Sequence, residues 1–459
     1  MHHRPPHQSV RPLVAILATA LFLLSALPHQ GRAQSRAPTP DDTRPIASFD
    51  SAWVKISRTY WDTLLVEGAW RAAYDSIRAT LRTTDDDDAI RRAIRALIAV
   101  PGQSHFTLIP GSAVPEPSRP SATRQGASAR GPGTLGVQVR SIGDTLVAWR
   151  VLAGGPAERA GLRAGNQIMA IDSLAVDTLR ARIARGSAAE PAKVQELVTT
   201  FVLARLNGQV GESTRLTFRD RAGRLRSPEL VRIPATGRLT QMGNLPPMVV
   251  SATSESLSIG RGQHATLIAF SAWLPAISPL LDSLLFGARQ APGLIIDLRG
   301  NPGGVVGMLA GVSGHLLDTA IALGVMHGRG ATIRFVANPR RVDRTGAQIG
   351  TFTGPVAVLV DGFTGSTSEF FAAGMQAVGR VRIFGVRSAG QSLPALLSRL
   401  PNGDVLMHAI ADHEDAAGRR VEGVGVQPDE LIPLRRVDLR NGRDAPLEAA
   451  RAWIASQQP

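Results

Sequence analysis

Residues 361–375 read Asp361-Gly-Phe-Thr-Gly-Ser-Thr-Ser-Glu-Phe-Phe-Ala-Ala-Gly-Met375, which predicts the end of a strand, a sharp turn and the start of a helix. The preceding run, 355–361, is short, apolar and valine-rich, which is typical of a strand buried on both faces. Ser366 lies at the turn, where free helix N–H groups and the helix dipole favour an oxyanion. The structural alternative is a capping box made by Ser366 and Glu369.

A second strand, turn and helix precede this one in the chain. The buried strand 294–298 runs into Arg299-Gly-Asn-Pro-Gly-Gly304, and a helix is expected over 305–317. Backbone amides in such a turn can face a negative charge. A phosphate cradle is the competing interpretation, but the turn lacks the Walker lysine and serine or threonine and does not fit the dinucleotide glycine spacing. We therefore rank an oxyanion role above phosphate binding.

The first 33 residues predict a signal peptide. Arg4 and Arg11 precede the apolar run 13–27, and small residues lead to Gln34. That run is too short for a comfortable membrane span, and no second long apolar stretch follows. We expect an exported protein, periplasmic or extracellular, without a transmembrane segment in the mature chain. Since the sequence has no cysteine, disulfides, lipidation at the cleavage point and a thiol nucleophile are excluded.

The composition is basic but does not predict a nucleic-acid partner. The net charge of +14 falls to +11 without residues 1–33, which contain three arginines and no acid. Only Lys55 and Lys193 are lysines, and the arginines form no polybasic tract with interleaved aromatics. Peripheral attraction to an anionic envelope surface stays open. The sequence does not indicate an oligomeric state.

Residues 34–110 predict a helical segment followed by a short strand. The acid run 85–88 precedes a helical pattern over 89–97, where acids suit the helix N-terminus better than a metal site. No metal-ligand spacing or cofactor motif occurs, so we expect neither a metal nor a cofactor. Ser104 and His105 lie at the turn and strand that end this segment, and His105 alone would more often be structural than catalytic.

Residues 111–132 predict a linker, and 133–237 resemble a PDZ domain. The resemblance rests on the loop Thr134-Leu-Gly-Val137 and on the segment 155–171, which matches the short helix and following strand of that family. It implies that the amides of Leu135, Gly136 and Val137 take a terminal carboxylate while a strand edge pairs with an extended peptide. The alternative is a spacer with a closed groove. Residues 238–459 form the remaining domain.

The motif order resembles the family of C-terminal processing and tricorn-core serine peptidases. The leader, helical segment and PDZ-like module precede Asp-Leu-Arg-x-Asn-Pro-Gly-Gly, Ser-x-Ser-Glu and Glu-Gly-x-Gly-Val-x-Pro-Asp. The resemblance implies an α/β fold with a crotonase-like core and hydrolysis of unfolded or C-terminally exposed polypeptides. In the processing branch a lysine 25 residues after the nucleophile is the base. That position here holds Gln391, whose amide cannot take a proton, so a serine–lysine dyad is excluded.

The tricorn-like branch matches residue by residue at Ser104, His105, Ser366 and Glu422. The resemblance implies that Ser366 is the nucleophile, that His105 takes its proton, and that Glu422 orients the imidazole through Ser104. It also implies that the oxyanion accepts hydrogen bonds from the backbone amides of Thr367 and of either Gly304 or Gly303.

Several alternatives stay open at these positions. Ser368 could replace Ser366 as nucleophile, although the family pattern places the active serine first. His408 and His413 are backup bases near a hairpin that we expect to be exposed, and Asp297 and Arg299 are expected to pair beneath the glycine turn. The competing function is a catalytically inactive relative that binds peptides or other ligands. An acyl-CoA enzyme on the same fold ranks last, because a PDZ-like module does not support it.

Overall fold

A computed structural model of the chain describes residues 45–82, 86–111, 131–186, 191–241, 247–343 and 345–458. The predicted signal peptide and almost all of the predicted linker lie outside these residues, so the structure does not test them. Over the part of the chain that is described, no helix is both long enough and apolar enough to cross a membrane.

A six-stranded sheet forms the centre of the C-terminal half. Its order is β14-β15-β16-β19-β20-β24, in which β14 is antiparallel to β15 and the other neighbours are parallel. The bounds are β14 (Ala252–Gly260), β15 (Gln263–Phe270), β16 (Leu294–Asp297), β19 (Val356–Val360), β20 (Arg382–Gly385) and β24 (Glu430–Leu431). Every residue of β16 and β19 is buried, as expected for apolar parallel strands covered on both faces.

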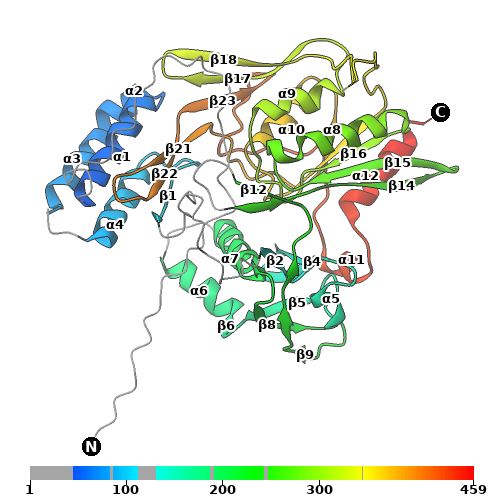
Figure 1. Cartoon of the computed structure of the whole chain (residues 1–459), viewed down its shortest axis with the longest axis horizontal. Coiled ribbons are helices and arrows are strands. Elements are labelled where there is room, and N and C mark those ends of the chain that lie inside the picture. The colour runs from blue at the N-terminus through cyan, green and yellow to red at the C-terminus, as the bar shows by residue number, and fades with distance from the viewer. Residues whose placement is uncertain are drawn as a thin grey trace, which may run out of the picture.

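Helices cover both faces of this sheet, which gives an α/β fold. The helices α8 (Ser278–Gly287), α9 (Gly307–Gly314) and α10 (Thr367–Ala377) share one apolar core with alternate residues of β16 and β19. On the other face α12 (Ala445–Ser456) packs its apolar residues against the intervening strand positions. Figure 1 shows these layers. The predicted strand, turn and helix around Ser366 are confirmed as β19 and α10.

A middle unit, residues 131–241, lies below this core in the view of Figure 1. Its main sheet has the order β10-β8-β5-β4-β3, so β3 is an edge strand, and β6 and β9 pair with β5 and β8. The strands of this unit are β2 (Pro132–Thr134), β3 (Val137–Ile142), β4 (Thr145–Val151), β5 (Gln167–Ile171), β6 (Leu174–Ala175), β7 (Asn207–Gln209), β8 (Ser213–Arg219), β9 (Leu225–Arg226), β10 (Glu229–Val231), β11 (Ile233–Pro234) and β12 (Arg238–Thr240). Its helices are α5 (Pro156–Arg159), α6 (Val176–Gly186) and α7 (Pro191–Leu206), and α7 packs against β3.

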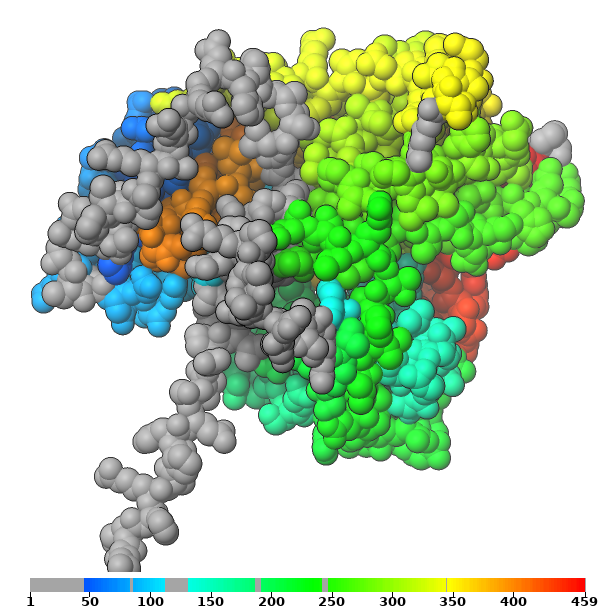
Figure 2. Space-filling model, viewed as in Figure 1, coloured from blue at the N-terminus to red at the C-terminus, as the bar shows by residue number. Residues whose placement is uncertain are grey.

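The N-terminal segment adds one strand to a sheet of the C-terminal half. After α1 (Pro45–Thr59), α2 (Thr63–Leu65), α3 (Arg71–Thr80) and α4 (Asp87–Ile98), the chain enters β1 (Thr107–Ile109). Strand β1 pairs with β22 (Val405–Ala409), which pairs with β21 (Ala395–Arg399). Figure 2 shows the helices in blue against this hairpin in orange. This pairing brings the segment before β1 next to the C-terminal half.

The acid run caps α4, as the sequence predicts. The Asp86 carboxylate accepts a hydrogen bond from Ala89 N at 2.8 Å, while Asp85 lies outside the described residues. The remaining elements are β13 (Met248–Val250), β17 (Ile321–Gly328), β18 (Ala331–Ala337), β23 (Ala411–Asp415) and α11 (Arg436–Arg440). Strands β18, β17 and β23 form an antiparallel sheet that packs against α10.

Candidate active site

Ser366 lies at the tight turn between β19 and α10, in a backbone conformation that non-glycine residues rarely adopt. Its φ is 52° and its exposed fraction is 4%. Such strain persists only where the surroundings fix the backbone. Here Ser366 N–H donates to the carbonyl oxygen of Gln391 at 2.8 Å and lies 3.1 Å from Glu369 Oε2. The turn is therefore held by two separate partners.

Glu369 does more than cap the helix. It is fully buried, and besides Ser366 it accepts hydrogen bonds from Ser388 Oγ at 2.5 Å, Gly390 N at 2.7 Å and Gln391 N at 2.9 Å. Burial raises the pKa of Glu369 to about 7, although these bonds favour the carboxylate. The capping-box spacing indicates the local bond, but no local signal shows that Glu369 also ties a distant loop to the Ser366 turn.

The glycine turn closes directly onto Ser366. A Cβ added at Gly303, whose φ is +102°, would lie 2.7 Å from Ser366 Cβ and 2.8 Å from Thr367 N, so only glycine fits there. Gly303 N–H donates to Asn301 Oδ1 at 2.9 Å, which corrects the expectation that it could face an oxyanion. Within the described residues the N–H groups of Gly304 and Thr367 donate no hydrogen bond. These two amides fit an oxyanion hole.

Trp273 holds the two turns together. Thr367 Oγ1 donates to the carbonyl oxygen of Gly304 at 2.7 Å, and Trp273 flanks Gly304 through a parallel bridge. Ser368 is fully buried, and its hydroxyl accepts from Trp273 Nε1 at 2.8 Å. This bond gives Ser368 a structural role, so it does not replace Ser366 as the nucleophile candidate.

His105 is held from one side by Ser104 and Glu422. Ser104 Oγ lies 2.7 Å from His105 Nδ1 and 2.9 Å from Glu422 Oε2, and Ser104 N donates to Glu422 Oε1 at 2.8 Å. The pair lies in a bend just before β1 rather than inside the expected strand, with a φ of 61° at His105. The structure therefore brings together three of the residues that the sequence singles out.

The hydrogen-bond directions leave His105 Nε2 as the unprotonated ring nitrogen. An ionised Glu422 only accepts hydrogen bonds, so the Ser104 hydroxyl donates to it, and Ser104 Oγ must then accept a hydrogen bond from His105 Nδ1–H. His105 Nε2 is buried with no partner among the described residues. Burial lowers the pKa of His105 to about 4 and raises the pKa of Glu422. At neutral pH the imidazole is neutral, as a general base requires.

The dipeptide Gln391-Ser392 joins the His105 half of the site to the Ser366 half. The carbonyl oxygen of Gln391 accepts from Ser366 N at 2.8 Å, and Ser392 N donates to Glu422 Oε2 at 2.8 Å. Two adjacent residues thus fix the nucleophile turn and the carboxylate behind the histidine. The backbone of this segment, rather than the Gln391 side chain, positions the catalytic candidates.

The Gln391 side chain instead faces the middle unit. Its Nε2 lies 3.4 Å from Glu196 Oε1 of α7, a contact that sequence reasoning missed. Lys193 donates to both Glu196 oxygens, at 2.9 and 2.8 Å. Lys193 is therefore linked to Gln391 through Glu196, to which its ammonium group donates both of its described hydrogen bonds.

The predicted pair of Asp297 and Arg299 is confirmed beneath the glycine turn. Arg299 Nη2 lies 2.8 Å from Asp297 Oδ2, and Arg150 of β4 lies 2.5 Å from the same oxygen. Although burial opposes ionisation, Arg299 and Arg150 hold the pKa of Asp297 well below its usual range. The pair therefore has a structural role.

Besides Glu196, Arg140 of β3 is another residue that the sequence did not single out. Its Nε lies 2.8 Å from Asp361 Oδ2, and both side chains are buried. Asp361 Oδ1 accepts from Gly300 N at 2.9 Å and Phe363 N at 3.0 Å. One arginine of the middle unit thus supports both the glycine turn and the Ser366 turn.

The two backup bases are buried, although the tip of the hairpin at 415–418 near them is exposed, as the sequence predicts. His408 and His413 each have an exposed fraction of 1%. Strand β22 is the central strand of its sheet, and the edge strand β23 packs against α10. His413 stacks on Phe370 with a ring separation of 3.6 Å. Burial lowers the pKa of His408 to about 4 and that of His413 to about 3. Both histidines therefore contribute to packing in the protein interior.

The predicted peptide-binding loop is partly occupied by its own backbone contacts. Leu135 N donates to Leu206 O at 3.2 Å, and Gly136 N donates to Thr134 Oγ1 at 3.1 Å. Val137 begins the edge strand β3. A terminal carboxylate would have to displace the Thr134 contact, whereas an extended peptide could pair along β3 without it.

Across the described residues no group of histidine, aspartate or glutamate side chains could hold a metal ion. The geometry instead offers a serine, a neutral imidazole backed by a carboxylate, and two amides. This combination can carry out nucleophilic acyl transfer.

Comparison with known proteins places the chain among peptidases. The sequence profile of peptidase family S41 matches residues 276–432. The chain is 26% identical over 389 residues to a carboxyl-terminal-processing protease of a Picosynechococcus species, covering 83% of this chain and 82% of that protein. It is 25% identical over 400 residues to the chloroplastic C-terminal processing peptidase of Tetradesmus obliquus, covering 84% and 78%.

Solved structures share the fold. The photosystem II D1 C-terminal processing protease superposes with a TM-score of 0.54 at 20% identity, covering 90% of this chain and 98% of that one. Mature CPAF gives a TM-score of 0.55 at 14% identity, covering 90% and 98%. At these identities the likeness establishes a shared mixed α/β architecture.

Proposed function

We propose that the chain is an exported serine endopeptidase in which Ser366 is the nucleophile and His105 the general base. The match of residues 276–432 to peptidase family S41 and the similarity of the chain to C-terminal processing proteases support this proposal. The observation that carries this proposal is the His105 ring nitrogen left without a partner while Ser104 and Glu422 hold the other one. The 391–392 backbone supports it by joining this relay to the Ser366 turn.

In the proposed first step His105 Nε2 takes the hydroxyl proton of Ser366 as Ser366 Oγ attacks the scissile carbonyl carbon. The imidazolium that forms is stabilised by the negative charge of Glu422, which acts through the Ser104 hydroxyl. A histidine with a pKa of about 4 before substrate binds has little affinity for a proton. The Glu422 charge therefore matters most in the transition state, when the positive charge develops.

The oxyanion formed by this attack would accept hydrogen bonds from Gly304 N–H and Thr367 N–H. Donors already in place for that charge need no reorganisation during the reaction. When the tetrahedral intermediate collapses, His105 gives its proton to the leaving amine, and an acyl group stays on Ser366. A water molecule, deprotonated by the same histidine, then releases the acyl group and restores the hydroxyl.

The proposed substrates are unfolded or C-terminally exposed polypeptides. The names of the relatives refer to C-terminal processing, and the edge strand β3 offers an unpaired backbone that an extended peptide can join. On the basis of the sequence motifs, we assign the middle unit to a PDZ-like domain and the six-stranded sheet with its helices to a crotonase-like core. Export rests on the leader pattern of residues 1–33.

Cleavage of casein, an unfolded protein, tests this function. The chain from Gln34 onward should cleave it, and Ser366→Ala and His105→Gln should each lose at least about 1000-fold in kcat/KM. Gln391→Ala is the matched control, since it keeps the backbone contacts of that loop and should retain activity. If His105→Gln stays active while Ser366→Ala does not, the base is another group. If the unmutated chain cleaves neither casein nor a peptide with a free C-terminus, the result would contradict the enzyme and favour the catalytically inactive binding protein.

A further inference from the structure

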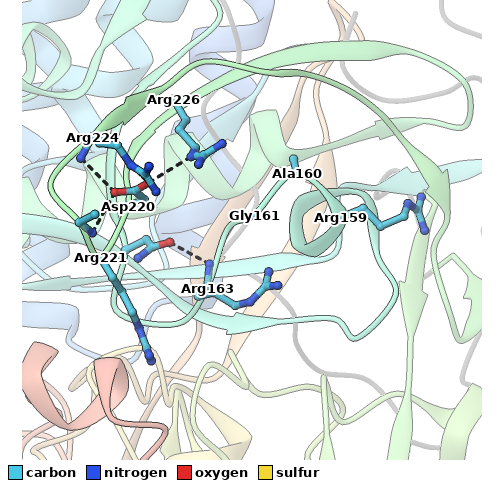
Figure 3. Close-up of a pocket in the computed structure, with 10 residues that line it drawn as sticks. Arg159, Ala160, Gly161, Arg163, Asp220, Arg221, Arg224 and Arg226 are labelled. Carbon is cyan, nitrogen blue, oxygen red and sulfur yellow. Dashed lines mark hydrogen bonds and ion pairs between the residues drawn. The ribbon is translucent and has the colours of Figure 1, made fainter.

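A pocket of about 370 Å³ on the middle unit has arginines as half of its ten lining residues. It lies between the segment that follows α5 and the β8–β9 hairpin, as Figure 3 shows. We call it the arginine pocket. Its charged residues are five exposed arginines and one aspartate, namely Arg159, Arg163, Arg221, Arg224, Arg226 and Asp220.

Only part of this positive charge is neutralised within the chain. Asp220 Oδ2 lies 3.1 Å from both Arg224 Nε and Arg226 Nε. The described side-chain contacts of Arg159 and Arg163 are to backbone carbonyl oxygens, including Glu158 O at 2.7 Å from Arg163 Nη1. A carbonyl oxygen orients a guanidinium group but does not cancel its charge.

Arg221 adds a guanidinium group without an ion pair among the described residues. Its carbonyl oxygen accepts a hydrogen bond from Arg440 Nη2 at 2.6 Å, so a further arginine contacts the Arg221 backbone. In Figure 3 the Arg221 side chain extends away from Asp220. Arginines gathered with so few acids repel one another, and a bound polyanion relieves that repulsion. Their planar forks suit phosphate oxygens in particular.

An exposed leucine beside the arginines favours a lipid surface over an acidic polypeptide. Leu225 lies between Arg224 and Arg226 in the sequence of the hairpin, does not line the pocket, and projects from the opposite face of β9 at the hairpin tip, with an exposed fraction of 60%. A large apolar side chain at a cationic tip can enter the boundary between headgroups and acyl chains while the arginines contact phosphates. An acidic peptide would give this leucine no comparable partner.

We propose that the arginine pocket and Leu225 bind the phosphate headgroups of anionic phospholipids and attach the middle unit reversibly to a membrane surface. This attachment is separate from peptide hydrolysis, because none of these residues contacts Ser366, His105 or Glu422. Since every contact is at the surface, binding should weaken as salt rises.

Vesicle cosedimentation of the chain from Gln34 onward, which retains every described residue, tests the proposal. Vesicles of phosphatidylglycerol mixed with phosphatidylcholine are compared with phosphatidylcholine alone, at low and at physiological salt. The test variant combines Arg159→Gln, Arg163→Gln and Arg221→Gln. The matched control removes the same charge elsewhere, through Arg92→Gln, Arg95→Gln and Arg334→Gln.

We expect binding to the anionic vesicles alone, reduced on the order of 100-fold in the test variant, since each arginine near an anionic surface contributes roughly fivefold. The control variant should lose less than about threefold. Leu225→Ser should also weaken binding, and it carries the test if circular dichroism finds the triple variant unfolded. Equal losses in both triple variants, or equal binding to both kinds of vesicle, would overturn the proposal. So would binding of poly-glutamate, but not of vesicles, that depends on these arginines, because the ligand would then be an acidic polypeptide.

Discussion

Replacing Glu422 with glutamine should slow catalysis about 100-fold while leaving the fold intact. The hydrogen bonds of 2.7 and 2.9 Å through Ser104 Oγ place His105 Nδ1 and Glu422 Oε2 no more than about 5.6 Å apart. Two unit charges at that separation, with an effective dielectric constant of about 20, attract by about 3 kcal/mol. A neutral amide removes this attraction from the transition state, in which His105 is charged, and about 3 kcal/mol corresponds to roughly 100-fold in rate.

The same substitution should lower the free energy of unfolding by about 1–3 kcal/mol. Glutamine can keep one oxygen towards Ser104 Oγ and Ser392 N, and its amide nitrogen then faces Ser104 N–H, which loses its acceptor. An unsatisfied buried donor costs about 1–3 kcal/mol. Thermal unfolding followed by circular dichroism measures this loss and shows whether the variant is folded at the assay temperature.

Peptide hydrolysis at mildly alkaline pH measures the kinetic effect, with Glu414→Gln as the matched control. Glu414 is a glutamate on β23 whose side chain is 43% exposed and pairs, among the described residues, with His327 alone, at 3.4 Å, so its loss should not change kcat. For Glu422→Gln we expect kcat to fall with KM nearly unchanged, because substrate does not contact Glu422. A folded Glu422→Gln variant within about threefold of the unmutated kcat would refute the relay through Ser104.

Three further predictions follow from the packing around the site. Gly303→Ala should abolish peptide hydrolysis and lower the unfolding temperature, since the added Cβ would lie 2.6 Å from a backbone oxygen; full activity would contradict the close turn. Arg140→Gln should lower the free energy of unfolding by about 3 kcal/mol, because it leaves Asp361 buried without its cation. The control Arg224→Gln, at an ion pair whose arginine is 68% exposed, should lower it by under about 1 kcal/mol. Equal losses of the two variants in urea titrations would contradict this prediction. As the pH falls from 6.5 towards 4 the unfolded chain protonates His408 while the folded chain, with a pKa of about 4, does not, so His408 should lower the stability by up to about 3 kcal/mol; His408→Gln should make the pH profile shallower by that amount, with the slope from His105 and His413 remaining, and an unchanged profile would contradict the assignment.

The sequence predicts the parts of the site that depend on local chemistry. The apolar run before Asp361 and the capping pair of Ser366 and Glu369 predict the strand, turn and helix, and the structure has β19 and α10 there. The pairing of Asp297 with Arg299 is similarly local, since the two residues are two positions apart and both are buried. Side chains this close in sequence leave few alternative partners.

The parts that the sequence did not predict depend on contacts between distant segments. Arg140 reaches Asp361 across 221 positions of the chain, and no periodicity distinguishes it from other arginines of the middle unit. The Gly303 amide is taken by Asn301, because the asparagine side chain folds back within the turn. The tip of the hairpin at 415–418 is exposed as predicted, but His408 is buried because β22 pairs with β1, which comes from the other end of the chain, and the hairpin pattern does not indicate that pairing.

The central claim is that His105, and no group at position 391, activates Ser366. The most direct measurement is the rate at which a serine-reactive phosphonate labels the chain, with the modified residue identified by peptide mass spectrometry. We predict that Ser366 is labelled, that His105→Gln slows labelling by at least about 1000-fold, and that Gln391→Ala leaves the rate within about threefold. Labelling of another residue, or equally fast labelling of Ser366 in His105→Gln, would contradict the account.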